Sequence, residues 1–266
     1  MTALAGWPCE TEARRFRLVS VDAQAEGGAS ELSPVLADAV AAAVGAGWAP
    51  PTILIVRPRR HALLGPKDAR LPALADGVAV LQAAGFPVYR RNAGGTAVVV
   101  DEGCLIFAVA KPCKDFVSVH RNFDEMTRGV RLALQRLGIA AEFGEAPGAF
   151  CAGPYDLVAQ GRKIAGIAQA IRRGCALVSG VLLVSQDPAA ATALLNRFYA
   201  AAGGEPRLVA ESVTTLAELL GRPVSLAEAE AALRGGFAQS DGWEPGALSA
   251  DELAAAHELL AERRLG

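Results

Sequence analysis

Residues that commonly bind metals or form disulfides are scarce in this chain of 266 residues. It has only three histidines, and its five cysteines are an odd number with no CxxC spacing. A structural zinc site needs closely spaced Cys and His ligands, and a disulfide framework needs paired cysteines. We therefore expect no metal site and no disulfide framework. The free thiols would be Cys9, Cys104, Cys113, Cys151 and Cys175.

Long apolar runs and an excess of one charge are also missing. No run approaches the roughly 20 residues needed to cross a bilayer, and the N-terminus has no apolar signal segment. The formal net charge is only -2, which disfavours a dedicated binder of nucleic acids or anionic membranes. We expect a cytoplasmic protein with no nucleic-acid or membrane partner.

Nucleotide-binding motifs and repeats are absent as well. The chain contains no GxxxxGK[ST] or GxGxxG sequence, so nucleoside triphosphate or nicotinamide sites of those types are not supported. It also has no internal repeat or low-complexity tract. Hydrophobic residues make up 52% of the chain and predict a well-filled core. This composition favours an enzyme that acts on small molecules or modifies proteins.

Hydrophobic periodicity predicts strands and helices that alternate irregularly along the first 188 residues. The strands between 87 and 110 are expected to pair antiparallel, and the turn at Gln160, Gly161 and Arg162 predicts a hairpin. Strands are expected at 16–21, 52–56, 87–91, 96–100, 104–110, 155–158, 163–169 and 176–184, and helices at 35–44, 71–84 and 122–137.

After Pro188 the pattern becomes almost wholly helical, with helices expected near 189–202, 214–220, 225–235 and 249–263. We therefore predict an α+β fold with mixed, mostly antiparallel sheets flanked by helices. Residues 1–188 would form the catalytic domain, and residues 189–266 a helical extension packed on it.

Two arginines run into a double glycine and a β-branched strand in RRNAGGTAVVV, residues 90–100. Without Cβ atoms at Gly94 and Gly95, the main chain can turn sharply and bring its N–H groups close to a ligand. Arg90 and Arg91 can add positive charge. The alternative is an ordinary hairpin turn with surface arginines.

A thiol lies among small residues in FCAGPYDLV, just before a strand. A cation near Cys151 would stabilise its thiolate and make it a nucleophile, whereas most free cysteines only pack. A lysine then starts the small-residue strand of GRKIAGIAQ. The Gly166 and Ala168 face leaves a groove for a slim apolar ligand, and Lys163 can reach its polar end. The alternative for Lys163 is a solvated side chain at a hairpin turn.

Taken in order, RRNAGGTAVVVDEG, FCAGPYDLV and GRKIAGIAQAIRRG resemble the lipoate-protein ligase A and octanoyltransferase family, which shares its catalytic fold with biotin protein ligases. The resemblance covers residues 52–184. The sequences GPKD at 65–68 and RLP at 70–72 favour its octanoyl-[glycine cleavage H protein]:protein N-octanoyltransferase branch.

This resemblance implies a protein N-octanoyltransferase that needs no cofactor. Cys151 would carry the acyl group as a thioester, while Lys163 would contact the acyl carbonyl and lower the pKa of the thiol. Its partners would be lipoyl-domain proteins, namely the glycine cleavage H protein and the E2 subunits of 2-oxoacid dehydrogenases. The acyl slot would be walled by Arg90, Arg91, Gly94, Gly95, Thr96, Ala97, Gly166 and Ala168.

One segment departs from the family, because residues 177–180 read LVSG where many members have a histidine-rich sequence. Help from a histidine is therefore not expected. Three alternatives stay open. The protein could be an ATP-dependent lipoate ligase in which Cys151 is incidental, a transferase that uses octanoyl-acyl carrier protein, or a catalytically inactive protein that binds acylated domains.

Overall fold

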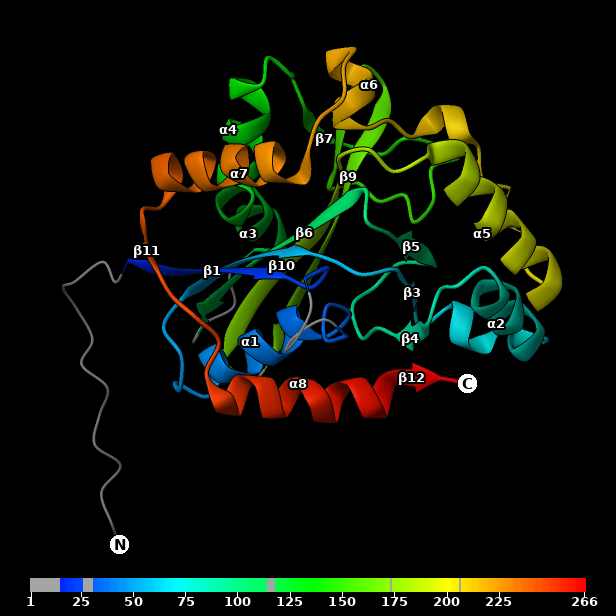
Figure 1. Cartoon of the computed structure of the whole chain (residues 1–266), viewed down its shortest axis with the longest axis horizontal. Coiled ribbons are helices and arrows are strands. Elements are labelled where there is room, and N and C mark those ends of the chain that lie inside the picture. The colour runs from blue at the N-terminus through cyan, green and yellow to red at the C-terminus, as the bar shows by residue number, and fades with distance from the viewer. Residues whose placement is uncertain (1–14, 26–30, 114–117, 173, 206) are drawn as a thin grey trace, which may run out of the picture.

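The structure is a computed structural model that describes residues 15–25, 31–113, 118–172, 174–205 and 207–266. Within these residues the strands form an eight-stranded sheet and a four-stranded sheet, both flanked by helices (Figure 1). Cys9 lies outside the described residues. The α+β class with mixed sheets is confirmed, and none of the described helices is long and apolar enough to cross a membrane.

The eight-stranded sheet forms the body of the molecule. β1 and β2 pair in parallel, and antiparallel pairing then runs from β2 through β6, β10, β9 and β8 to β7. The predicted hairpin is confirmed as β8 and β9, with positive φ at Gln160 and Gly161. In sheet order the strands are β11 (Trp243–Pro245), β1 (Phe16–Asp22), β2 (Thr52–Arg57), β6 (Cys104–Pro112), β10 (Cys175–Leu183), β9 (Arg162–Arg172), β8 (Asp156–Ala159) and β7 (Glu142–Gly144).

The four-stranded sheet has the order β12 (Arg264–Leu265), β4 (Val88–Arg90), β3 (His61–Leu64) and β5 (Val98–Val100). Its arrangement shows that the expected antiparallel pairing among the strands between 87 and 110 is wrong. β4 pairs in parallel with β3, β5 pairs antiparallel with β3, and β6 belongs to the larger sheet. The reason is β3, a short strand that the sequence pattern missed and that separates β4 from β5.

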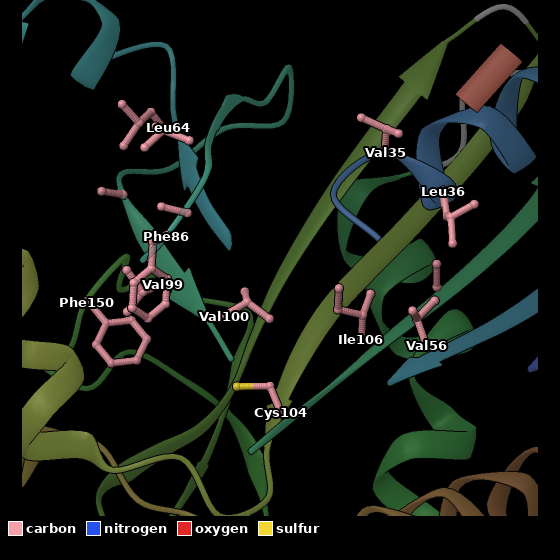
Figure 2. Packing of buried hydrophobic residues seen from close by; sticks show 14 of the residues in the cluster. Val35, Leu36, Val56, Leu64, Phe86, Val99, Val100, Cys104, Ile106 and Phe150 are labelled. Carbon is pink, nitrogen blue, oxygen red and sulfur yellow. The ribbon is translucent and has the colours of Figure 1, made fainter. Parts of the chain in front are cut away.

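Helices cover both faces of the larger sheet and create two hydrophobic cores. On one face α1 (Leu36–Gly45) packs on β6 and β10, and α8 (Ala250–Arg263) packs on α1. The opposite core holds α3 (Val119–Met126), α4 (Arg128–Arg136) and α7 (Leu226–Ser240). Figure 2 shows part of the first core, which includes Leu36, Cys104 and Phe150.

The helix expected at 122–137 is instead two helices, α3 and α4, that meet at Thr127. The Thr127 hydroxyl donates a hydrogen bond to the Phe123 carbonyl at 2.7 Å. A threonine hydroxyl can compete in this way with main-chain donors for a helix carbonyl, and it often bends the helix. The apolar period continues across the break, so the periodicity did not reveal it.

The C-terminal region contains the expected helices, α5 (Pro188–Ala202), α6 (Leu216–Leu220), α7 and α8. It also contributes β11 and β12, which the sequence pattern missed and which join the two different sheets. α5 packs against α2 (Leu74–Ala83) beside the smaller sheet. The division of the chain at residue 188 stays a prediction.

The contact between α4 and α7 is close enough to test this packing directly. A Cβ added to Gly236 would lie 2.0 Å from the Gly129 carbonyl oxygen, so the two helix backbones would have to separate. We expect Gly236→Ala to lower the free energy of unfolding by about 2 kcal/mol, because overpacking outweighs the helix propensity of alanine. Chemical denaturation measures this change.

Gly235→Ala is the matched control on the same helix. The nearest atom to its added Cβ is the end of the flexible Arg136 side chain, which can move away. This variant should be as stable as the parent protein or gain up to about 1 kcal/mol. Equal stability of the two variants would show that α4 and α7 are not in backbone contact.

Candidate functional site

A cavity of about 390 Å³ lies between the two sheets, where the three predicted stretches meet. Its apolar wall includes Val99 of β5, Ile106 of β6 and Leu183 of β10. Its volume lies in the range of roughly 300 to 1,000 Å³ that is usual for small-ligand sites. Seven of the predicted site residues line it: Arg91, Gly94, Gly95, Cys151, Lys163, Gly166 and Ala168.

Cys151 occupies the loop between β7 and β8, and its backbone is strained. Its φ is 47°, a left-handed value that side chains other than glycine seldom adopt. Such strain persists where the surrounding structure enforces it, and it is frequent at functional sites. The conformation brings Sγ within 2.9 Å of Nη2 of Arg91 and 3.3 Å of the Thr96 backbone nitrogen, and both donate hydrogen bonds to it.

The surroundings of Cys151 favour its thiolate. Burial opposes ionisation, but the charges of Arg91 and Lys163 and the hydrogen bonds from Thr96 and Arg91 outweigh it, so the pKa of the Cys151 thiol lies below its ordinary value. By contrast, burial raises the pKa of Cys175 to about 12. A thiolate is the reactive form of cysteine, so these surroundings make Cys151 a better nucleophile at a given pH than an unperturbed thiol.

Lys163 is not solvated at the hairpin, because its side chain is only 2% exposed. Its Nζ donates hydrogen bonds to the carbonyls of Phe150 at 3.0 Å and Cys151 at 2.7 Å, and it lies 2.8 Å from Oδ2 of Asp156. All three N–H groups of the ammonium therefore have an acceptor. Lys163 holds the thiol loop, while its expected contact with an acyl carbonyl stays a prediction.

Asp156 is a site residue that the sequence reasoning missed, although it stands inside the quoted FCAGPYDLV stretch. It is 2% exposed, and besides Lys163 it accepts hydrogen bonds from the backbone N–H groups of Gly153 and Ile167. Burial raises the pKa of Asp156, although Lys163 and these two N–H groups oppose the rise. A charged residue that follows a small-residue loop and opens an apolar strand was the available signal.

Gly95 is required beside the thiol for steric reasons. Its φ is 103°, and an added Cβ would lie 2.5 Å from Sγ of Cys151 and 2.7 Å from Nη2 of Arg91. The same guanidinium nitrogen donates to the Thr96 carbonyl at 2.6 Å. Gly94 has no atom within 4 Å of an added Cβ. Of the two glycines, only Gly95 is constrained by the thiol.

Some of the remaining predicted residues line the cavity and others do not. Gly166 and Ala168 lie on one face of β9 and line the cavity, as the small-residue groove requires. Arg90 is exposed, Thr96 is partly buried and Ala97 is buried, and none of the three lines the cavity. Thr96 contributes its backbone N–H to the thiol.

The wall formed by β10 carries Ser179 and Gly180 where a histidine-rich sequence is frequent in the resembling family. No group of three or more His, Cys, Asp or Glu side chains in the described part of the chain is arranged to hold a metal ion. The groups that act on the thiol are the charges of Arg91 and Lys163 and the hydrogen bonds from Arg91 and the Thr96 backbone N–H.

The contact with Arg91 predicts the reactivity of the thiol. Arg91→Gln removes the positive charge next to Sγ and the hydrogen bond that the guanidinium donates to it. The pKa of Cys151 should therefore rise, and its alkylation at pH 7 should slow severalfold. Iodoacetamide labelling followed by peptide mass spectrometry measures the rate across pH. Arg90→Gln, at the exposed neighbouring arginine, should keep the parent profile; equal effects of the two variants would contradict the assignment.

The two glycines provide a second matched pair. Gly95→Ala should displace either the thiol or the Arg91 guanidinium and slow alkylation of Cys151 by about tenfold, because both lie within contact of the added methyl group. Gly94→Ala meets open space and should behave as the parent protein. An unchanged alkylation rate in Gly95→Ala would show that the thiol is not held in this position.

Similarity to known proteins extends over most of the chain. The model of the lipoyl protein ligase A/B catalytic domain matches residues 35–238. An octanoyl-[GcvH]:protein N-octanoyltransferase of Exiguobacterium sibiricum is 39% identical over 171 residues, which span 62% of this chain and 63% of that protein. The enzyme of the same name from Bacillus velezensis is 36% identical and is matched over 74% of this chain and 72% of its own length.

Solved structures show the same architecture. Lipoate-protein ligase A bound with ATP matches with a TM-score of 0.75 and 23% identity, over 93% of this chain and 95% of its own. A bi-partite lipoate protein ligase from Thermoplasma acidophilum, studied with its E2 lipoyl domain, has a TM-score of 0.68 and 22% identity, over 93% and 92% of the two chains. At these identities the likeness shows the fold. Together with the match to the family model, it shows that the chain belongs to the lipoyl protein ligase A/B catalytic-domain family.

Proposed function

We propose that this protein is an acyltransferase that moves an octanoyl or lipoyl group from a carrier protein to a lysine of a lipoyl domain through a thioester on Cys151. The observation that carries the proposal is the thiol itself, which has a lowered pKa, contacts two hydrogen-bond donors and faces an apolar cavity. The names of the two matched relatives, both octanoyl-[GcvH]:protein N-octanoyltransferases, support the acyl transfer.

The reaction would proceed in two balanced steps. In the first, the Cys151 thiolate attacks the acyl carbonyl, a C–S bond forms, and the C–N bond to the donor lysine breaks. The donor protein leaves as an amine that takes a proton from solvent. In the second, the amine of the acceptor lysine attacks the thioester, an amide bond forms, and the C–S bond breaks. The amine releases its proton, and the enzyme regains its thiolate.

Each step passes through a tetrahedral intermediate whose oxygen carries negative charge. The Thr96 N–H and the Arg91 guanidinium donate to the sulfur in the structure, and they would turn to this oxygen once acylation has removed the charge from the sulfur. A preorganised donor of this kind is typically worth about 3 kcal/mol. Lys163 would act mainly by adding positive charge and fixing the loop, and it would reach the oxyanion only by exchanging one of its present acceptors.

The acyl chain would occupy the apolar part of the cavity. Gly166 and Ala168 leave space along β9, Ile106 of β6 lines the cavity from the same sheet, and Val99 of β5 lines it from the smaller sheet. An unbranched chain gains stabilisation from burial of about 0.8 kcal/mol per CH₂ group. This arrangement supports the predicted substrate-binding role of the small-residue strand.

Lipoyl-domain proteins would be both donors and acceptors, with the glycine cleavage H protein and E2 subunits as the classes expected from the sequence. The proposed transfer conserves the energy of the acyl bond and therefore needs neither ATP nor a resident cofactor. A reducing cytoplasm would keep Cys151 as a thiol, which supports a location there.

Mass spectrometry tests this function most simply. Mixing the protein with octanoylated H protein, without ATP, should add one octanoyl mass to Cys151, and hydroxylamine should remove it because thioesters react with this reagent. Cys151→Ser should lower octanoyl transfer to a lipoyl domain by about a thousandfold or more, since it replaces the thiolate with a far weaker nucleophile, a neutral hydroxyl.

Cys113→Ser serves as the matched control, because Cys113 is also partly exposed but lies outside the cavity lining. It should keep both the adduct and the transfer activity. An octanoyl adduct that persists in the Cys151 variant, or transfer that requires ATP, would overturn the proposal.

A further inference from the structure

A buried tyrosine reaches the candidate site from the C-terminal region. Tyr199 lies on α5, is 2% exposed, and stands more than 40 residues beyond Cys151 in the sequence. Its hydroxyl accepts a hydrogen bond from the Ala97 backbone N–H at 3.0 Å. A buried hydroxyl of this kind is tolerated only when it has hydrogen-bond partners.

The second partner of Tyr199 is an equally buried carboxylate. The Tyr199 hydroxyl donates to Oδ1 of Asp68 at 3.1 Å, and the Asp68 side chain is also 2% exposed. The other oxygen of Asp68 accepts from the Gly65 backbone N–H at 2.9 Å. The carboxylate therefore connects the segment after β3 with α5, and the tyrosine extends the connection to the segment before β5.

These contacts end next to the thiol. Ala97 directly follows Thr96, and Gly95 directly precedes Thr96. The Thr96 backbone nitrogen lies 3.3 Å from Sγ of Cys151. Gly65 is packed so closely beneath this segment that a Cβ on it would lie 1.9 Å from the Gly95 carbonyl oxygen. The segment 95–97 is thus held at Gly95 by close packing against Gly65 and at Ala97 by the hydrogen bond to the Tyr199 hydroxyl.

We propose that Tyr199, together with Asp68, is a positioning residue that fixes residues 95–97 so that the Thr96 N–H and the Arg91 guanidinium meet the sulfur of Cys151. The expected effect on octanoyl transfer rests on the proposed function, whereas the expected effect on the pKa of the thiol does not. Tyr199 does not contact the sulfur, and it acts through the backbone of Ala97.

The polar nature of the pair favours positioning over simple packing. A tyrosine and a carboxylate in an apolar core contribute no more stability than well-packed hydrophobic side chains of similar size. Hydrogen bonds, however, fix direction, and the Tyr199 hydroxyl uses one to receive the Ala97 N–H and another to reach Asp68. Burial raises the pKa of Asp68, while the Gly65 N–H, the Tyr199 hydroxyl and the charge of Arg91 oppose the rise.

Tyr199→Phe in the full chain tests the proposal, because it removes the hydroxyl and keeps the ring. The pH profile of Cys151 alkylation should move to higher pH, since a shifted Thr96 N–H stabilises the thiolate less. The kcat of octanoyl transfer should fall by about tenfold or more, as for a misplaced donor, while KM for the carrier protein changes less than twofold.

Tyr89→Phe is the matched control. Tyr89 is a similarly buried tyrosine, 5% exposed, on β4 of the same four-stranded sheet, and in the described residues no hydrogen bond joins it to residues 95–97. It should keep the parent alkylation profile and kcat, whatever its effect on stability. An alkylation profile for Tyr199→Phe that matches the parent protein would overturn the proposal, even if its melting temperature were lower.

Asp68→Asn keeps the inference testable if Tyr199→Phe fails to fold. Loss of the carboxylate charge by itself would favour the thiolate, so an alkylation profile moved to higher pH would show lost positioning, and an unchanged or opposite shift would overturn the proposal. Alkylation needs no acyl donor. A parent protein that forms no octanoyl adduct would therefore reject the transferase function while the alkylation profiles still decide the role of Tyr199.

Discussion

The buried ion pair between Lys163 and Asp156 is the interaction on which the geometry of the site depends. Both side chains are 2% exposed, and their charged atoms lie 2.8 Å apart. Removal of charges from water is costly, so such a pair persists only when its other hydrogen-bonding positions are filled. Here two loop carbonyls and two backbone N–H groups fill them, and the pair thereby ties the Cys151 loop to β8 and β9.

The thiol lies where this tied loop meets a segment of the smaller sheet. The larger sheet supplies the loop and its ion pair, and the segment before β5 supplies Arg91, Gly95 and the Thr96 N–H. The charges that lower the pKa of Cys151 come from both sides of this junction, from Arg91 on one side and Lys163 on the other. The reactivity of the cysteine is thus a property of the junction between the sheets.

The sequence predicted the residues of this junction better than their contacts. The order of the Arg/Gly segment, the cysteine loop and the lysine strand identified Cys151, Lys163 and Gly95. The burial of Lys163 depends on Asp156 and on carbonyls of a folded loop, which no local pattern reveals. Tyr199 and the pairing of β4 and β5 with β3 were missed for the same reason, because each depends on chain segments distant in sequence or on a strand of only four residues.

Passage of the acyl group through Cys151 is tested most directly by the isolated acyl-enzyme. The protein would be loaded with labelled octanoyl, freed of donor, and mixed rapidly with an unmodified lipoyl domain. The label should move from Cys151 to the acceptor lysine at least as fast as the steady-state turnover. A loaded enzyme that transfers its label more slowly than turnover, or keeps it, would show that the acyl group does not pass through Cys151.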